Sequence, residues 1–200
     1  EAYDEMLMAD AERAGGSEYA EICALSFRQS IAAHKLVADI DGTPLFFSKE
    51  NFSNGCIATV DVTYPSAPLY LLTAPALLKG MLIPILDYAE TGRWKFPFAP
   101  HDLGTYPLAN GQVYGGGERT DDNQMPVEEC GNMLLLAGAL VEFGGDLDFA
   151  RRYRETLKLW ADYLLDKGYD PENQLCTDDF AGHLAHNTNL SLKAILALGA

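Results

Sequence analysis

Acidic side chains recur in the segments that separate the apolar runs of this sequence. Asp102 lies in APHDLGTYP, Glu129 in MPVEECGN and Asp179 in CTDDFAGH. Two carboxyl groups held close together have their pKa values pushed apart, so that one donates a proton while the other accepts one. Hydrolysis of a glycosidic or amide bond needs this combination, because the leaving atom is protonated while a water molecule is activated. We predict Asp102 and Glu129 as the acid/base pair and Asp179 as a third catalytic residue.

Other polar and aromatic side chains in the same segments are candidates for binding a small polar substrate. Carboxylates, imidazoles and amides would anchor its polar groups, and aromatic rings would stack on a sugar or form a wall of the site. The predicted substrate-binding residues are Asp61, Tyr64, Trp94, His101, Glu128, Asp178, His183 and Asn187.

A structural interpretation competes for several of these residues. Glu128 and Glu129 follow Pro126 in the first turn of an expected helix, where acidic side chains interact favourably with the helix dipole. Asp178 and Asp179 would likewise cap the segment that follows them. The aromatic side chains would then fill the core.

Established motifs for metal, nucleotide or serine chemistry do not occur. The sequence contains no HExxH, GxSxG or GxxxxGK motif, which disfavours a zinc protease of that kind, a serine hydrolase and a nucleotide-binding enzyme. His183 and His186 stand three residues apart and would need Asp178 or Asp179 to complete a metal site, but their spacing matches no established zinc signature. We expect no metal ion and no other cofactor.

The composition limits the class of partner. The 200 residues carry 14 Lys and Arg against 29 Asp and Glu, a formal net charge of −15, and 48% of them are hydrophobic. This apolar share suffices for a globular core, while the excess of acidic groups disfavours nucleic acid and anionic membrane surfaces. We therefore expect a small polar substrate, no nucleic acid and no membrane partner.

Helical periodicity predicts most of the secondary structure. Apolar residues recur three and four positions apart, and Pro75, Pro126 and Asp146 are typical of helix starts. Small residues such as Gly131 would let a neighbouring helix approach closely. We expect helices over 1–13, 17–39, 75–91, 126–143, 147–167 and 190–200, and a rigid turn over 63–68. We expect loops over 93–124 and 169–183, and a loop with short extended pieces, for example 44–47, over 43–62. Such pairs of helices are typical of stacked hairpins, which gather their long loops at one end.

Four longer stretches of the sequence are distinctive. They are NFSNGCIATVDVTYPSAPLYLL, FAPHDLGTYPLANGQVYGGG, MPVEECGNMLLLAGAL and DPENQLCTDDFAGHLAHNTNLSLKAI. They resemble the six-helical-hairpin domain of the glutaminase A-like family over nearly the whole chain. The resemblance implies an all-α fold, an (α/α)6 toroid of helical hairpins, in a secreted or periplasmic protein. Residues 1–200 would form the N-terminal part of this domain, about half of the toroid, truncated at the C-terminus. Because half a ring exposes apolar flanks, we expect it to bind the remaining half of the toroid or to self-associate.

The resemblance also implies a reaction, the hydrolysis of L-glutamine to L-glutamate and ammonia. Carboxylate acid/base chemistry at the loop end of the toroid would carry it out. Six-hairpin toroids are mostly glycoside hydrolases, so hydrolysis of a glycan is the first alternative. A non-catalytic carbohydrate-binding or scaffold domain is the second.

Overall fold

The structure, a computed structural model, describes residues 2–50, 52–177 and 179–200, without the side chain of Asp179. Most of the described residues are helical, which confirms the predicted all-α class, and their two strands form one small sheet. None of the described helices combines the length and the apolar character that crossing a membrane requires. The elements follow one another as α1 (Ala2–Gly15), α2 (Ser17–Ala32), β1 (His34–Ala38), β2 (Pro44–Ser48), α3 (Val60–Thr73), α4 (Pro75–Glu90), α5 (Pro126–Gly144), α6 (Leu147–Arg152), α7 (Arg154–Lys167), the 3₁₀ helix η1 (Asp179–Ala181) and α8 (Thr188–Gly199).

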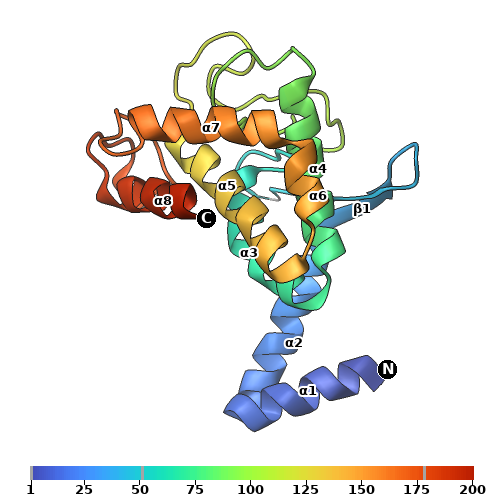
Figure 1. The fold of residues 1–200 in the computed structure, drawn as a ribbon. Helices are drawn as coiled ribbons and strands as arrows, with labels where there is room; N and C mark the ends of the chain where they lie inside the picture. Colours follow the sequence, from blue (N-terminus) through green and yellow to red (C-terminus); the bar gives the residue numbers. More distant parts are fainter. Residues whose placement is uncertain (1, 51, 178) are drawn as a thin grey trace.

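Helix α5 is the central helix of the main body. It contacts α3, α4, α6, α7 and α8, whereas α1 and α2 form an arm that extends away from the body (Figure 1). The short connections between α3 and α4 and between α5 and α6 lie at the end of the body nearest the arm, and the loop over 91–125 lies at the opposite end (Figure 1). Tight turns and the longest loop are thus separated, as expected for helical hairpins.

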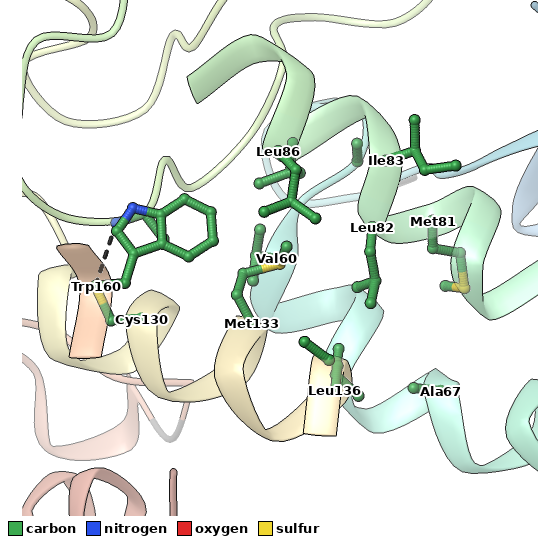
Figure 2. Packing of buried hydrophobic residues seen from close by; sticks show 14 of the residues in the cluster. Val60, Ala67, Met81, Leu82, Ile83, Leu86, Cys130, Met133, Leu136 and Trp160 are labelled. Atoms are coloured by element: carbon green, nitrogen blue, oxygen red, sulfur yellow. Dashed lines mark hydrogen bonds between the residues drawn. The ribbon is translucent and has the colours of Figure 1, made fainter. Parts of the chain in front are cut away.

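The core lies between α3, α4, α5 and α7. Figure 2 shows Leu82 and Leu86 of α4 close to Val60 of α3 and Met133 of α5. These side chains and Trp160 of α7 are buried. Burying one large apolar side chain contributes about 1.5–3 kcal/mol. This layer therefore fixes the relative positions of α3 and α5, whose first turns carry acidic residues.

Two glycines allow close approach of neighbouring elements. A Cβ at Gly80 of α4 would lie 2.6 Å from the carbonyl oxygen of Pro44 in β2. A Cβ at Gly131 of α5 would lie 2.7 Å from Cγ of Lys193 in α8. The expectation that small residues of α5 admit a neighbouring helix is confirmed, and that helix is α8.

The prediction of one helix over 17–39 is wrong in its second half. Helix α2 ends at Ala32, and β1 then pairs antiparallel with β2, placing His34 opposite Ser48. Leu36 and Ile40, which continue the helical pattern, are 56% and 103% exposed. The hairpin forms because Phe46 of β2 is buried, with its ring stacked 4.5 Å from that of His34. Long-range packing overrides the local periodicity here.

The prediction of a rigid turn over 63–68 is also wrong, because these residues lie inside α3. Pro65 and Pro68 interrupt the hydrogen-bond ladder of this helix, but its packing against α4 and α5 maintains it. The predicted helix over 147–167 is divided at Tyr153 into α6 and α7. Its predicted cap is confirmed, since the side chain of Asp146 accepts a 3.0 Å hydrogen bond from the amide of Phe149.

We expect His34 to make stability depend on pH. Burial lowers the pKa of His34, with a smaller contribution from Lys49, against the raising effect of its hydrogen bond with the Ser30 carbonyl. As pH falls through the ordinary histidine value of about 6.5, the unfolded chain binds the proton first, so the free energy of unfolding decreases. Urea unfolding of the full-length protein at pH 7 and pH 5 measures this decrease, which His34→Gln should reduce. The exposed His186 provides the control, because His186→Gln should leave the decrease as it is in the unaltered protein. Equal decreases in all three proteins would contradict the prediction.

Candidate functional site

Two segments that are distant in sequence lie side by side at the start of α3. The amide of Ile57 donates to the carbonyl of Gly104 at 2.8 Å, and the amide of Leu103 donates to the carbonyl of Ile57 at 3.0 Å. The amide of Val60, the first residue of α3, donates to the carbonyl of His101 at 2.8 Å. These backbone hydrogen bonds place the first turn of α3 next to His101.

His101 is the centre of a group of carboxylates. Its Nδ1 lies 2.9 Å from Oδ2 of Asp102, and its Nε2 faces Oδ1 of Asp61 at 3.8 Å and Oε1 of Glu129 at 4.0 Å. The imidazole ring is stacked on the ring of Tyr114 at a centroid distance of 4.0 Å. The structure thus brings together residues from the start of α3, the 91–125 loop and the first turn of α5.

Asp102 holds both His101 and the surrounding loop. Its Oδ1 accepts hydrogen bonds from the amides of Gly104 and Val113 at 2.7 and 3.1 Å, and its Oδ2 accepts one from the amide of Tyr114 at 3.2 Å as well as contacting His101. Burial by itself would raise the pKa of Asp102, but the hydrogen bond with His101 and those from the amides outweigh it and lower the pKa. Asp102 is therefore an anionic anchor for the imidazole and the loop.

Glu129 and Asp61 lie in an environment that disfavours their charge. The pKa of Glu129 is held well above its ordinary value by burial and by the neighbouring charges of Asp61 and Glu128. Burial also raises the pKa of Asp61, and His101 opposes this effect. Acidic residues in a first helical turn usually face water, whereas Glu129 is 0% exposed. Favourable interaction with the helix dipole does not explain such burial, which costs several kcal/mol for a charged group.

Glu128 forms a second polar cluster beside the first. Its Oε1 accepts hydrogen bonds from Lys193 of α8 and from the hydroxyl of Thr177. Nδ2 of Asn132 lies 3.2 Å from both Oε1 of Glu128 and Oε2 of Glu129, and so joins the two clusters. The Lys193 ammonium also donates to Oδ1 of Asn132 at 2.7 Å and lies 4.5 Å from the ring centroid of Tyr64.

One known protein family and two curated fungal proteins are similar to this chain. The family model described as the glutaminase A six helical-hairpin domain matches residues 16–200. The chain belongs to the glutaminase A six helical-hairpin family. It is similar to "Glutaminase A" of Aspergillus oryzae, with 41% identity over 198 residues covering 98% of this chain and 28% of that protein. It is also similar to a probable glutaminase of Arthroderma benhamiae, with 31% identity over 255 residues covering 99% of this chain and 29% of that protein. The chain thus spans less than a third of the length of these relatives.

Several predicted site residues of this glutaminase A-family chain lie outside the two clusters. Trp94 is 5% exposed and donates its indole N–H to the carbonyl of Phe98, so it is part of the aromatic core and does not face the site. Asn187 is the N-cap of α8 and accepts from the amides of the two residues that follow Thr188. His183 is exposed in the loop after η1.

The roles predicted for Asp178 and Asp179 stay predictions. Asp178 lies outside the described residues, as does the side chain of Asp179, whose backbone begins η1. His186, considered with them as a metal ligand, is exposed and pairs with Asp170 through Nδ1 at 2.6 Å.

Two residues that complete the two polar clusters of this chain, Asn132 and Lys193, were not predicted from the sequence. Asn132 follows Glu128 by four positions on α5, and this spacing places both on one helical face. The sequence could therefore have predicted that Asn132 lies beside Glu128. Lys193 is the only charged residue of the apolar segment that forms α8. A lone charge among apolar residues suggests a buried partner, but no local pattern identifies that partner as Glu128.

We expect Asp102→Asn to destabilise the protein by on the order of 3 kcal/mol. An asparagine side chain has one acceptor oxygen where aspartate has two. In either orientation of the amide, its NH₂ group would therefore face hydrogen-bond donors that now bond to a carboxylate oxygen. Chemical denaturation of the full-length protein measures the loss. Asp121→Asn in the same long loop, at an exposed side chain, should change stability by less than about 0.5 kcal/mol. Equal stabilities of the two variants would contradict the anchoring role.

Proposed function

We propose that this chain carries the hydrolytic site of a glutaminase, which acts on the side-chain amide of L-glutamine. One observation carries the proposal. In a chain of the glutaminase A family, Asp61, His101 and Glu129 converge from three separate segments, with one ligand atom of each within 4.8 Å of the others. The names of the two similar fungal proteins support the choice of an amide substrate.

Amide hydrolysis requires an activated water molecule and a proton for the leaving group. The oxygen of water bonds to the amide carbon, the carbon–nitrogen bond breaks, and a proton released from the water leaves with ammonia. His101, Asp61 and Glu129 would surround this water and transfer its proton. Asp102 would act as a positioning residue, because its oxygens already accept hydrogen bonds from His101 and three backbone amides.

The experiment compares substrates and variants in the full-length protein. We expect ammonia release from L-glutamine, and no release of reducing sugar from a panel of glycans. Glu129→Gln, which keeps the side-chain shape, should lower the rate by about 10²–10⁴-fold. Glu142→Gln changes an exposed glutamate on the same helix and should leave the rate unaltered.

The possible outcomes distinguish the three functions considered for this chain. Sugar release without ammonia release would replace the glutaminase with a glycoside hydrolase. Release of neither product would favour a non-catalytic binding or scaffold domain. Ammonia release that survives Glu129→Gln would remove Glu129 from the reaction.

A further inference from the structure

The side chains around Nε2 of His101 present hydrogen-bond acceptors to one another. Nδ1 of His101 lies 2.9 Å from the Asp102 carboxylate, and a proton on Nδ1 leaves Nε2 of a neutral imidazole as an acceptor. Nε2 faces one oxygen of Asp61 and one of Glu129. Oε1 of Glu129 is fully buried and accepts no hydrogen bond from the described residues. A group of converging acceptors is stable when a cation lies between them.

The distances between these atoms suit a bound metal ion better than direct hydrogen bonds. At 3.8 and 4.0 Å, Nε2 is beyond the 2.7–3.2 Å of ordinary hydrogen bonds. Histidine nitrogen and carboxylate oxygen bind Zn²⁺ at about 2.0–2.2 Å, so two ligands of one tetrahedral ion lie about 3.3–3.6 Å apart. The three atoms lie within 4.8 Å of one another and would move inward by roughly 1 Å or less to bind an ion.

The surrounding side chains already orient the three ligands. The contact of Asp102 with Nδ1 is the carboxylate–histidine arrangement that fixes metal-binding imidazoles. Asn132 donates to Oε2 of Glu129 at 3.2 Å, which leaves Oε1 directed toward His101. Asp61 keeps partial solvent access, with its side chain 17% exposed, so an ion and a water molecule have a route to the site.

We infer that Oδ1 of Asp61, Nε2 of His101 and Oε1 of Glu129 bind one divalent transition-metal ion, with Zn²⁺ preferred over Mg²⁺ and Ca²⁺. Imidazole together with carboxylate favours Zn²⁺ and similar ions, whereas Mg²⁺ and Ca²⁺ prefer oxygen ligands alone. Three protein ligands leave a coordination position for water, and a bound ion would acidify that water. The sequence predicted no metal ion here, because these ligands lie far apart along the chain and form no spacing motif.

Binding of the ion does not depend on the glutaminase proposal. If both hold, the ion would bind the attacking water, and the three side chains would hold the ion instead of accepting the proton through the atoms that bind it. The inference concerns the ligands, and its test uses direct metal binding as the readout.

The test titrates Zn²⁺ and Mn²⁺ into full-length protein that has been treated with a chelator, with Mg²⁺ and Ca²⁺ as comparisons, and follows binding by calorimetry. We expect one Zn²⁺ site that Glu129→Gln and Asp61→Asn each weaken at least tenfold. Asp102→Asn should weaken it about 10–100-fold. Glu142→Gln should bind Zn²⁺ as the unaltered protein does. Circular dichroism identifies any variant that fails to fold. If the buried Glu129→Gln does not fold, Asp61→Asn, at a partly exposed position, still tests the site.

Two results would overturn the inference. One is the absence of Zn²⁺ binding by the unaltered protein. The other is Zn²⁺ binding that all the variants retain with equal affinity, which would place the ion elsewhere. Hydrolysis of glutamine that persists without any metal binding would sustain the proposed function and refute the metal site. Metal binding without hydrolysis of glutamine would sustain the metal site and refute the proposed function.

Discussion

Replacing His101 with asparagine should lower kcat/KM for L-glutamine by about 10³-fold. The imidazole contacts Asp102 through one nitrogen and faces Asp61 and Glu129 through the other. Asparagine can replace the hydrogen bond to Asp102, but its short side chain cannot reach both carboxyls. Steady-state ammonia release by the full-length protein measures the loss.

The matched control for this variant is His186→Asn. His186 is exposed, pairs with Asp170 and has a positive φ of 58° that asparagine tolerates. The control should retain the activity of the unaltered protein. If His101→Asn kept more than about a tenth of that activity, His101 would have no part in proton transfer or in positioning the water.

Replacing Lys193 with methionine should destabilise the protein by about 3–5 kcal/mol. The Lys193 side chain is 12% exposed and forms an ion pair with Glu128, which is fully buried. Removing the ammonium leaves the Glu128 carboxylate with an uncompensated charge in the interior, although methionine preserves most of the aliphatic packing along Gly131. The denaturant midpoint of the full-length protein reports the change.

A second substitution tests the cause of this loss. Because Glu128→Gln removes the stranded charge, the double variant Lys193→Met/Glu128→Gln should be more stable than Lys193→Met alone. On the exposed face of α7, Lys158 pairs with Asp162 at 2.5 Å, and Lys158→Met should cost less than about 1 kcal/mol. Similar losses for Lys193→Met and Lys158→Met would show that burial of the Glu128 pair does not matter.

Local sequence signals predicted the elements whose starts and ends depend on neighbouring residues. Pro126 begins α5 and Asp146 caps α6, as expected, because helix starts are decided by φ restriction and by a side-chain acceptor a few residues away. The same local rules failed over 63–68, where two prolines predict a turn. There, packing of α3 against α4 and α5 compensates for the missing backbone hydrogen bonds.

The sequence predicted the kinds of residue that form the candidate site, but only some of the individual residues. The sequence offered five residues of the two clusters, Asp61, His101, Asp102, Glu128 and Glu129, because carboxylates and an imidazole suited to acid/base chemistry recur in the segments between apolar runs. Trp94 was selected from the same segments but is in the core. Aromatic side chains are amphipathic, and nothing in a short window says which side of the chain faces the interior.

The sequence by itself determined the family of this protein, its helical class and the acidic groups that are available for chemistry. Only the tertiary structure decided that the carboxyls of Asp61 and Glu129 both face Nε2 of His101, and that Lys193 neutralises Glu128. The physical reason is that these contacts depend on backbone hydrogen bonds between residues 57–60 and 101–104 and on the close approach of α8 to α5 at Gly131. Each of these contacts joins segments that are far apart in the chain. It stabilises the protein only when the helices of the core pack together, so no local stretch of sequence specifies it.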